Sequence, residues 1–404
     1  KDYSRFRNAL SYFVTRWVDK GYILVSDKWM RQQHNIECQL EPRMDKEELT
    51  TSYITPERIV WTSDSTGISI KHSEKLLLPN SGQTYVNANN GCILDSHKSE
   101  QPGILLDFGR ELQGGLQIST GMRKETRPLK VRIRFGESVS EAMSSVGKEG
   151  TGLLAATNDH AIRDMVVELP WLGNLEVGNT GFRFVRIDLV DTNETLPLNS
   201  VRAVFKYRDI PYLGSFVSDD NRLNKIWETG AYTVHLNMQN YLWDGIKRDR
   251  LVWIGDLHPE VMTVNTVFGN QSVVYKSLDF VRDNTPLPGW MNEISSYSLW
   301  WIIIQRDLYL YQGNSQYLNE QKSYLKTLLG QIEANIDVQG SEQYPIANRF
   351  LDWPTSGNTQ AIHVGLQSLT VSAVKAALQI AEWLEDNELE KYSNRLLQRI
   401  EKYI

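Results

Sequence analysis

The sequence predicts a multidomain protein in which an antiparallel β-sandwich is followed by an all-helical α/α domain. The chain has 404 residues, which is too long for one ordinary domain and sufficient for two. Apolar and polar residues alternate with a period of two from about residue 52 to 207, as on strands with one buried face. From about residue 211 the apolar residues recur at helical spacing, with no strand pattern between them. We therefore expect domains at 52–210 and 211–404, with 1–51 unassigned.

Several segments of the first domain have the pattern of strands. Residues 129–137 (LKVRIRFGE) and 184–190 (FVRIDLV) alternate apolar with charged side chains, which favours strands with one wet face. Residues 103–118 are expected to form two strands joined by a turn at the adjacent glycines 114 and 115. Short strands separated by turn signals are typical of an antiparallel sandwich.

Six helices are expected in the second domain. Ser218 is the expected N-cap of the first helix, because Asp219 and Asp220 follow it in the first turn, where the helix dipole favours acids. The last helix ends on an apolar stripe without a polar tail, so we expect the native protein to continue beyond residue 404. The other helices are expected over 259–282, 296–312, 315–337, 366–385 and 387–404.

Composition argues against several classes of protein. The net charge is −6 without long charged runs, whereas a nucleic-acid binder would show a basic stripe. No apolar run approaches the roughly 18 residues of a membrane span. The seven histidines are scattered, and we expect no metal and no cofactor. Cys38 and Cys92 could form one disulfide or remain as two buried thiols.

The stretch WDGIKRDRLVWIGD, residues 243–256, concentrates charge beside aromatic surface. Two carboxylates flanking a bond are the usual machinery for splitting a glycosidic linkage, and aromatic faces suit the C–H faces of sugars. The alternative is a salt-bridged turn between two helices, which the spacing alone favours. Eight of the twelve tryptophans lie between Trp227 and Trp383, as stacking platforms or as a Trp-rich core. The three carboxylates of the stretch are Asp244, Asp249 and Asp256.

The charge around Asp249 bears on its use as an acid. A general acid that works near neutral pH requires a raised pKa. Arg248 and Arg250 would lower the pKa of Asp249 if they pointed at it, whereas burial beside an aromatic wall or the two other aspartates would raise it. In an extended segment both arginines would point away from Asp249, and would then neutralise its acidic neighbours or bind hydroxyls.

The stretch resembles the signature of the α-L-rhamnosidases of glycoside hydrolase family 78, in a form like that of Bacteroidetes members. The resemblance implies an inverting hydrolase that releases terminal α-L-rhamnose. It also implies a six-hairpin α/α toroid behind the sandwich, of which the six helices would be about the first half. Further segments resemble family elements in the family's order, namely LLDFGRELQGGLQIST, GFRFVRIDLV, GSFVSDDNRLNKIWE and RFLDWPTSGN.

The resemblance also implies roles for individual residues. Asp249 takes the place of the general acid, which is normally a glutamate in this family. Because Asp is one methylene shorter, the acid could be misplaced, and a 1 Å error can cost about a hundredfold in rate. The general base of the family is a Glu in the later half of the toroid, expected here beyond residue 404. The implied substrate-binding residues are Asp244, Arg248, Trp253, Asp256, Trp300, Asp352 and Trp353.

Three other functions stay open at this stage. The protein could hydrolyse a different sugar, bind carbohydrate without turnover, or act as a purely structural helical scaffold. The expected partner is a carbohydrate, with no nucleic acid, no membrane span and no predicted oligomeric state. The resemblance implies a periplasmic or extracellular location in a bacterium, with the cytoplasm as the alternative.

Overall fold

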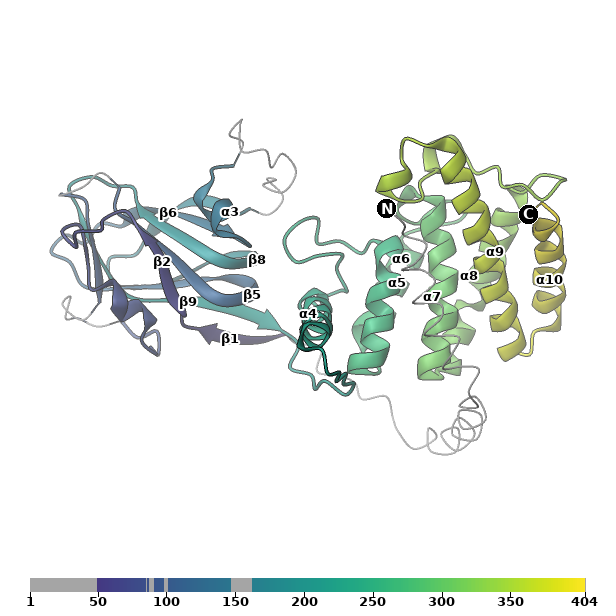
Figure 1. Ribbon diagram of the computed structural model, residues 1–404, viewed down its shortest axis with the longest axis horizontal. Coiled ribbons are helices and arrows are strands. Elements are labelled where there is room, and N and C mark those ends of the chain that lie inside the picture. Colours follow the sequence, from purple (N-terminus) through teal and green to yellow (C-terminus); the bar gives the residue numbers. More distant parts are fainter. Residues whose placement is uncertain (1–48, 85, 87–90, 98–100, 147–161, 404) are drawn as a thin grey trace. The chain divides into compact units, whose positions relative to one another are not determined.

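The computed structural model describes residues 49–403, except for residues 85, 87–90, 98–100 and 147–161. An antiparallel sheet region comes first along the chain and an all-helical region follows it (Figure 1). The predicted order of strands and then helices is therefore confirmed. Of the unassigned segment 1–51, only the last three residues are described. Cys38 lies outside the described residues, whereas Cys92 is buried, and burial raises the pKa of its thiol to about 12.

Within the described residues, nine strands hydrogen-bond into one antiparallel sheet (Figure 1). Their order is β3-β4-β9-β5-β8-β6-β7, with β1 also paired to β9 and β2 also paired to β5. The sheet core is formed by the apolar side chains of the long strands, and the short helix α3 (Val139–Met143) follows β6. The strands are β1 (Thr50–Ile54), β2 (Arg58–Thr62), β3 (Ile70–Lys71), β4 (Cys92–Asp95), β5 (Gly103–Thr120), β6 (Leu129–Gly136), β7 (Asp164–Leu169), β8 (Gly173–Leu189) and β9 (Thr195–Tyr207).

The strand predictions hold for β6 and β8, but the turn expected at glycines 114 and 115 is wrong. Strand β5 runs through them without reversing. Gly114 has φ 143°, and the register shifts between Gly114 and Leu116, as at a β-bulge. A Cβ on Gly114 would lie 1.9 Å from the carbonyl oxygen of Val204. The glycine therefore permits a close approach of two strands, which a sequence pattern does not distinguish from a turn.

The helical region is a series of helical hairpins. Short 3-10 segments η7 (Met291–Glu293), η8 (Ile346–Asn348) and η9 (Trp353–Thr355) lie in the loops before helices α7 and α9. The helices are α4 (Asn221–Asn237), α5 (Ile254–Thr263) with the π-helical extension η6 (Val264–Phe268), α6 (Ser272–Asp283), α7 (Ser295–Gln312), α8 (Ser315–Ala334), α9 (Thr359–Trp383) and α10 (Asn387–Glu401).

The first two predicted helices differ from the observed helices in their boundaries. The N-cap of α4 is Asp220, whose side chain accepts the N–H of Arg222 at 2.8 Å, whereas Ser218 donates its hydroxyl to the carbonyl of Asp220. The helix expected over 259–282 is two helices, because Gly269 at φ 74° ends η6 before α6 begins. Gly in the left-handed region is a frequent helix terminator.

Two further helices begin earlier than predicted. Helix α5 begins at Ile254, so that Pro259 lies inside it and Asp256 lies in its first turn, not at its cap. Helix α9 begins at Thr359, where the side chain of Asn358 accepts the N–H of Ala361. The helices expected over 296–312 and 315–337 are confirmed within a few residues.

Helices α5, α7 and α9 pack side by side, α5 on α7 and α7 on α9 (Figure 1). Alternate helices of successive hairpins run in the same direction, so their three N-termini lie at one end of the helical region. We call this end the site end. The loops that reach it are the ones before α5, before α7 and before α9.

One helix of the described part, α9, is long and apolar enough to cross a membrane by length and composition alone. Its most apolar window is 56% buried, and its apolar side chains belong to the core of the helical region. A core helix of this kind meets the same criterion as a membrane helix.

Candidate active site

The loop before α5, residues 243–253, carries most of the charged stretch, and we call it the signature loop. Its middle is attached to the sheet. Ile246 is buried in the sheet core against Gly181, where a Cβ would come within 2.7 Å of the Ile246 side chain. Lys247 is 8% exposed and forms ion pairs with Glu137, at 3.0 Å, and with Glu141. These contacts fix the base of the loop, so the neighbouring carboxylates have a defined position.

The two ends of the signature loop are hydrogen-bonded to each other. The N–H of Asp244 donates to the carbonyl of Leu251 at 3.0 Å, and the N–H of Leu251 donates to Asp244 Oδ1 at 2.9 Å. The Asp244 carboxylate therefore closes the loop with one oxygen. Its other oxygen is not required for that bond.

The tip of the signature loop is not extended, which decides between the two arrangements that the sequence left open for its arginines. Asp249 and Arg250 have φ of 44° and 57°, both in the left-handed region, and such backbone strain is often found at functional sites. The reversal brings Arg248 Nε to 3.6 Å from Asp249 Oδ1, and Arg250 donates to the carbonyl of Asn179. Arg248 thus points toward the candidate acid, and its side chain is 57% exposed.

Asn292, in the loop before α7, holds the backbone on both sides of Trp253. Its Nδ2 donates to the carbonyl of Val252 at 3.1 Å, and its Oδ1 accepts the N–H of Ile254 at 3.1 Å. Asn292 adopts φ 50°, which Asn tolerates better than most side chains. The sequence pattern does not point to this residue, because it contains no signal for a contact between the two loops.

The acids of the stretch lie close enough to influence one another. Burial raises the pKa of Asp244 to about 6, and the negative charges of Asp249 and Asp256 contribute, while the Leu251 N–H opposes the shift. Burial likewise raises the pKa of Asp256, with a contribution from the charge of Asp249. The structure therefore brings together the three carboxylates that the sequence placed in one stretch.

A fourth acid, Glu260, belongs to the same group and was missed by the sequence analysis. It lies one turn after Asp256 on α5 and is 7% exposed. Its Oε1 accepts Asn237 Nδ2 at 2.7 Å, while Oε2 is buried without a partner among the described residues. Burial raises the pKa of Glu260 to about 8, and Asp256 and Asp244 add to it. We call Asp244, Asp249, Asp256 and Glu260 the acidic cluster.

Two aromatic side chains stand beside the acidic cluster. Trp253 and Tyr297 meet edge to face, with ring centroids 6.1 Å apart. A Cβ on Gly255 would lie 2.1 Å from the Tyr297 ring, so only glycine lets the ring reach this position. Burial raises the pKa of Tyr297 to about 12, with contributions from Asp256 and Asp244. Tyr297 was not singled out from the sequence, although it lies in the segment from which Trp300 was chosen.

Trp300 lies further along α7 and packs on His258 of α5, with ring centroids 5.0 Å apart. His258 Nε2 is in turn 2.8 Å from Asp307 Oδ2. Trp300 is partly buried against the helical core. These contacts place Trp300 between two helices, and its expected role in substrate binding stays a prediction.

Asp352 and Trp353 lie in the loop before α9, at the same end as the signature loop. Ser295 and Ser296, in the first turn of α7, donate to the carbonyls of Asn348 and Phe350 at 3.0 and 2.6 Å and so anchor this loop. Asp352 caps η9, accepting the N–H of Thr355 at 3.1 Å. Trp353 is 81% exposed. An exposed tryptophan is available for stacking on a ligand.

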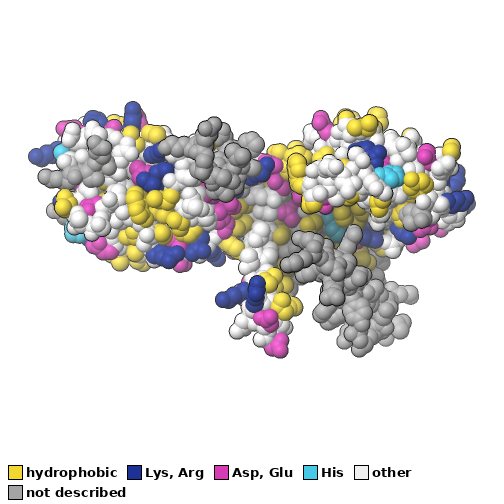
Figure 2. All heavy atoms as spheres, turned by 45° about the horizontal axis from the view of Figure 1, so that its top comes forward, with side chains coloured by type: hydrophobic (Ala, Val, Ile, Leu, Met, Phe, Trp, Pro, Cys, Tyr) yellow, Lys and Arg dark blue, Asp and Glu magenta, His cyan; other side chains and the backbone are white. Residues whose placement is uncertain are grey.

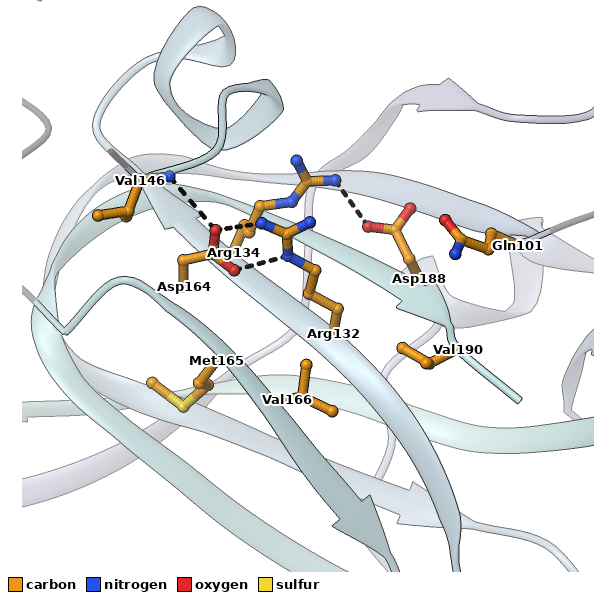
Figure 3. Close-up of a pocket in the computed structure, with 9 residues that line it drawn as sticks. All are labelled: Gln101, Arg132, Arg134, Val146, Asp164, Met165, Val166, Asp188 and Val190. Atoms are coloured by element: carbon orange, nitrogen blue, oxygen red, sulfur yellow. Dashed lines mark hydrogen bonds and ion pairs between the residues drawn. The ribbon is translucent and has the colours of Figure 1, made fainter. Parts of the chain in front are cut away.

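A cleft on the sheet offers a different arrangement of charge (Figure 3). It has a volume of about 460 Å³. Arg132 binds Asp164 with Nε at 2.7 Å, and Arg134 binds Asp188 at 2.8 Å. The close-up shows these guanidinium groups directed at the carboxylates. Charges paired in this way stabilise the sheet, so the site end is the better candidate for chemistry.

The surface has no segregation of charge on the face that Figure 2 shows, where Lys and Arg side chains alternate with Asp and Glu. In the described ranges, no group of three His, Cys, Asp or Glu side chains has an arrangement that could hold a metal ion.

Comparison with known proteins identifies the class of the helical region. Residues 211–404 match the family model described as the bacterial alpha-L-rhamnosidase six-hairpin glycosidase domain. A curated alpha-L-rhamnosidase from Alteromonas sp. (strain LOR) is 27% identical over 267 residues, which are 62% of this chain. The match spans 27% of that relative, about a quarter of its length.

Solved structures with the same fold cover the sheet region as well as the helices. A rhamnosidase from Klebsiella oxytoca with rhamnose bound has a TM-score of 0.67 at 17% identity, over 88% of this chain and 71% of that one. A family 78 rhamnosidase of Bacillus sp. GL1 has a TM-score of 0.63 at 17% identity, over 82% and 33%. At such identities the likeness shows the fold. Together with the family match, it shows that this chain has the fold of the rhamnosidase structures and that its helical region is similar to the six-hairpin glycosidase domain of the bacterial alpha-L-rhamnosidases.

Proposed function

We propose that this protein is an inverting glycoside hydrolase that releases terminal α-L-rhamnose from glycans or glycosides. The observation that carries the proposal is the acidic cluster, which lies beside Trp253 at the site end of a rhamnosidase-family domain. The rhamnose bound to the Klebsiella relative supports the same sugar class. The same observations also support a hydrolase of a related sugar, which the substrate assay below tests.

In the proposed reaction, Asp249 gives its proton to the glycosidic oxygen as its bond to the anomeric carbon breaks, while water attacks that carbon from the opposite face and loses a proton to the general base, for which we propose a Glu of the later half of the toroid. Asp244 and Asp256 accept hydrogen bonds from sugar hydroxyls, because ionised carboxylates are acceptors. Arg248, beside Asp249 at 3.6 Å, can donate to a hydroxyl near the reacting bond. Trp253 and Trp353 supply aromatic surface for the methyl group and C–H faces of the sugar.

The shorter acid is compatible with the observed loop. With the left-handed backbone at Asp249 and Arg250, the tip of the loop turns back and does not continue as an extended strand. A change of backbone direction can move a carboxyl by as much as one methylene group, which is the length lost from Glu to Asp. This supports Asp249 as the acid in place of a glutamate.

The test is hydrolysis of a chromogenic α-L-rhamnoside by the full-length protein, followed by NMR of the first anomer released. We expect turnover with inversion, and a strong loss in the Asp249→Asn variant. Binding of rhamnose without turnover would identify a non-catalytic carbohydrate-binding protein. Turnover that the variant leaves unchanged would assign the acid to another residue, and turnover of a different glycoside alone would change the sugar.

The finer architecture belongs to the same proposal. We propose a β-sandwich over 52–210 and the first part of an α/α toroid over 211–404. Rhamnosidase structures that match over 82–88% of this chain support both domains. A periplasmic or extracellular bacterial location would suit a polysaccharide-degrading enzyme, and fractionation of the producing cell would test it.

A further inference from the structure

A second cleft opens at the site end, next to the signature loop. It has a volume of about 680 Å³, within the size range of small-ligand sites. Its walls come from the C-terminal end of α6, the loop before α7 and the loop before α9. Asn292 lines this cleft and also holds the backbone on both sides of Trp253. Asn292 therefore lies between the cleft and the signature loop.

The polar groups of the cleft include three acceptors. Asn284 uses its Nδ2 on the carbonyl of Phe280 at 2.8 Å, and Asn348 uses its Nδ2 on the carbonyl of Glu293 at 2.7 Å. Each amide thus keeps an oxygen that can accept. The Glu293 carboxylate has no ion-pair partner in the part of the chain that the structure describes. These three groups suit a ligand that donates several hydrogen bonds.

The apolar part of the cleft is rigid and aromatic. Phe280 is 42% exposed, and Pro286, Pro288 and Pro345 line the same walls. No Lys or Arg stands among the described lining residues. Aromatic and proline surface suits the C–H faces of a sugar ring. The acceptor groups and the absence of a cation disfavour an anionic ligand, because nothing would neutralise its charge.

We infer that this cleft binds a neutral sugar, namely the part of the substrate that continues beyond the terminal rhamnose. This inference rests on the proposed function for the position of rhamnose beside Trp253. Because Asn292 lies between the cleft and the signature loop, a substrate with its rhamnose beside Trp253 extends its next part into the cleft. The protein then selects rhamnosides whose leaving group is an uncharged oligosaccharide.

The test compares two substrates with the same terminal sugar. α-L-Rhamnosyl fluoride has a one-atom leaving group that does not reach the cleft, whereas a rhamnosylated neutral disaccharide does. Phe280→Ala and Asn284→Ala should each lower kcat/KM for the trisaccharide about tenfold, which corresponds to about 1.4 kcal/mol. Hydrolysis of the fluoride should stay within about twofold. The matched control is Phe216→Ala, an aromatic of similar exposure, 44%, outside the cleft.

Equal losses with both substrates, or no loss with either, would overturn the inference. If the wild-type protein hydrolyses neither rhamnoside, the proposed function fails, and the cleft is tested by binding alone. Calorimetric titration with the neutral disaccharide should then show binding that Phe280→Ala weakens about tenfold, and weaker binding of a disaccharide with a uronic acid. Binding that the variant leaves unchanged, or no binding, would refute the cleft assignment as well.

Discussion

Buried carboxylates occur in both parts of the molecule, and their surroundings differ. In the sheet, burial would raise the pKa of Asp107, but hydrogen bonds from Arg183, the Gly109 N–H and Arg58 outweigh it and hold the pKa at about 2. At the site end, Asp244 and Glu260 are also buried, and their pKa values rise to about 6 and about 8. Burial is common to both, so the difference comes from the cations.

This comparison separates structural charge from functional charge. A carboxylate that is paired with guanidinium groups has its charge neutralised inside the fold. Carboxylates that lie close to one another without such partners retain a proton or are available to bind a ligand. Asp244, Asp256 and Glu260 are of the second kind, whereas Asp249 has the exposed Arg248 guanidinium beside it, and we assign the chemistry to this cluster.

The largest effect is expected for Asp249→Asn. General acid catalysis contributes about 10²- to 10⁴-fold to rate, so kcat for an α-L-rhamnoside should fall by that factor. Thermal unfolding should change little, because the Asp249 side chain is 29% exposed and the Arg248 side chain beside it is 57% exposed. Asp219→Asn, on the surface before α4, is the control for a generic loss of charge. A large fall in melting temperature would assign Asp249 a structural role instead.

The next effect concerns pH and Glu260. A raised carboxyl pKa means that the folded state binds protons more tightly, so the unfolding free energy falls as pH rises from about 4.5 to about 8. Glu260→Gln keeps the acceptor for Asn237 and removes the proton. The variant should match the wild type near pH 4 and exceed it by up to roughly 4 kcal/mol above pH 8.

Urea unfolding at several pH values measures this difference. Glu320→Gln, on an exposed position of α8, is the matched control and should follow the wild type at every pH. A constant offset between Glu260→Gln and the wild type would contradict a titration of Glu260 in this range.

Breaking the paired charges of the sheet should act on stability and not on chemistry. Asp107→Asn leaves Arg183 and Arg58 without their carboxylate, and we expect a loss of about 2–3 kcal/mol. The value lies below that of a fully buried pair, because the two arginine side chains are 36% and 63% exposed. The stability that Asp107 contributes is present above pH 3.8 and is lost as pH falls toward 2.

Chemical unfolding at pH 7 and kcat at a temperature well below the transition together test this variant. A specific loss of kcat in a folded Asp107→Asn protein would contradict the assignment of Asp107 to stability alone.

The smallest effect is expected for Asn292→Ala, which removes two hydrogen bonds to the backbone beside Trp253. We expect about 1–2 kcal/mol of lost stability and a rise in KM for rhamnosides that exceeds the fall in kcat. With α-L-rhamnosyl fluoride as the substrate, Asn284→Ala, a change in the second cleft, is the control. Identical kinetic changes in both variants would show that Asn292 does not position Trp253.

The sequence was sufficient to predict the order of strands and helices, because hydrophobic periods of two and 3.6 are local properties. The fold of β5 was not predicted, since Gly114 serves a close approach to Val204 from a distant strand. The start of α5 was not predicted either. Pro259 suggested a later start, but the tertiary contact from Asn292 supports the earlier turn.

The candidate site could be predicted only in part for the same reason. Asp244 and Asp256 lie in one stretch and were found together. Glu260 and Tyr297 join them through helix packing, which a linear motif does not encode. The direction of Arg248 was left open by the sequence, because it depends on the left-handed tip at Asp249, which reverses the chain.

Asn292 also limits how α5 can be transferred to another protein. Helix α5 begins at Ile254 without a side-chain cap of its own, because the residue before it is Trp253. The first N–H of the helix is instead bonded by Asn292, which comes from the following hairpin. The hydrogen bond on the first N–H of α5 therefore requires the loop before α7 to be in place. Transplanting the signature loop with α5 alone into another scaffold would leave the first turn frayed, so the transferable unit is the pair of hairpins.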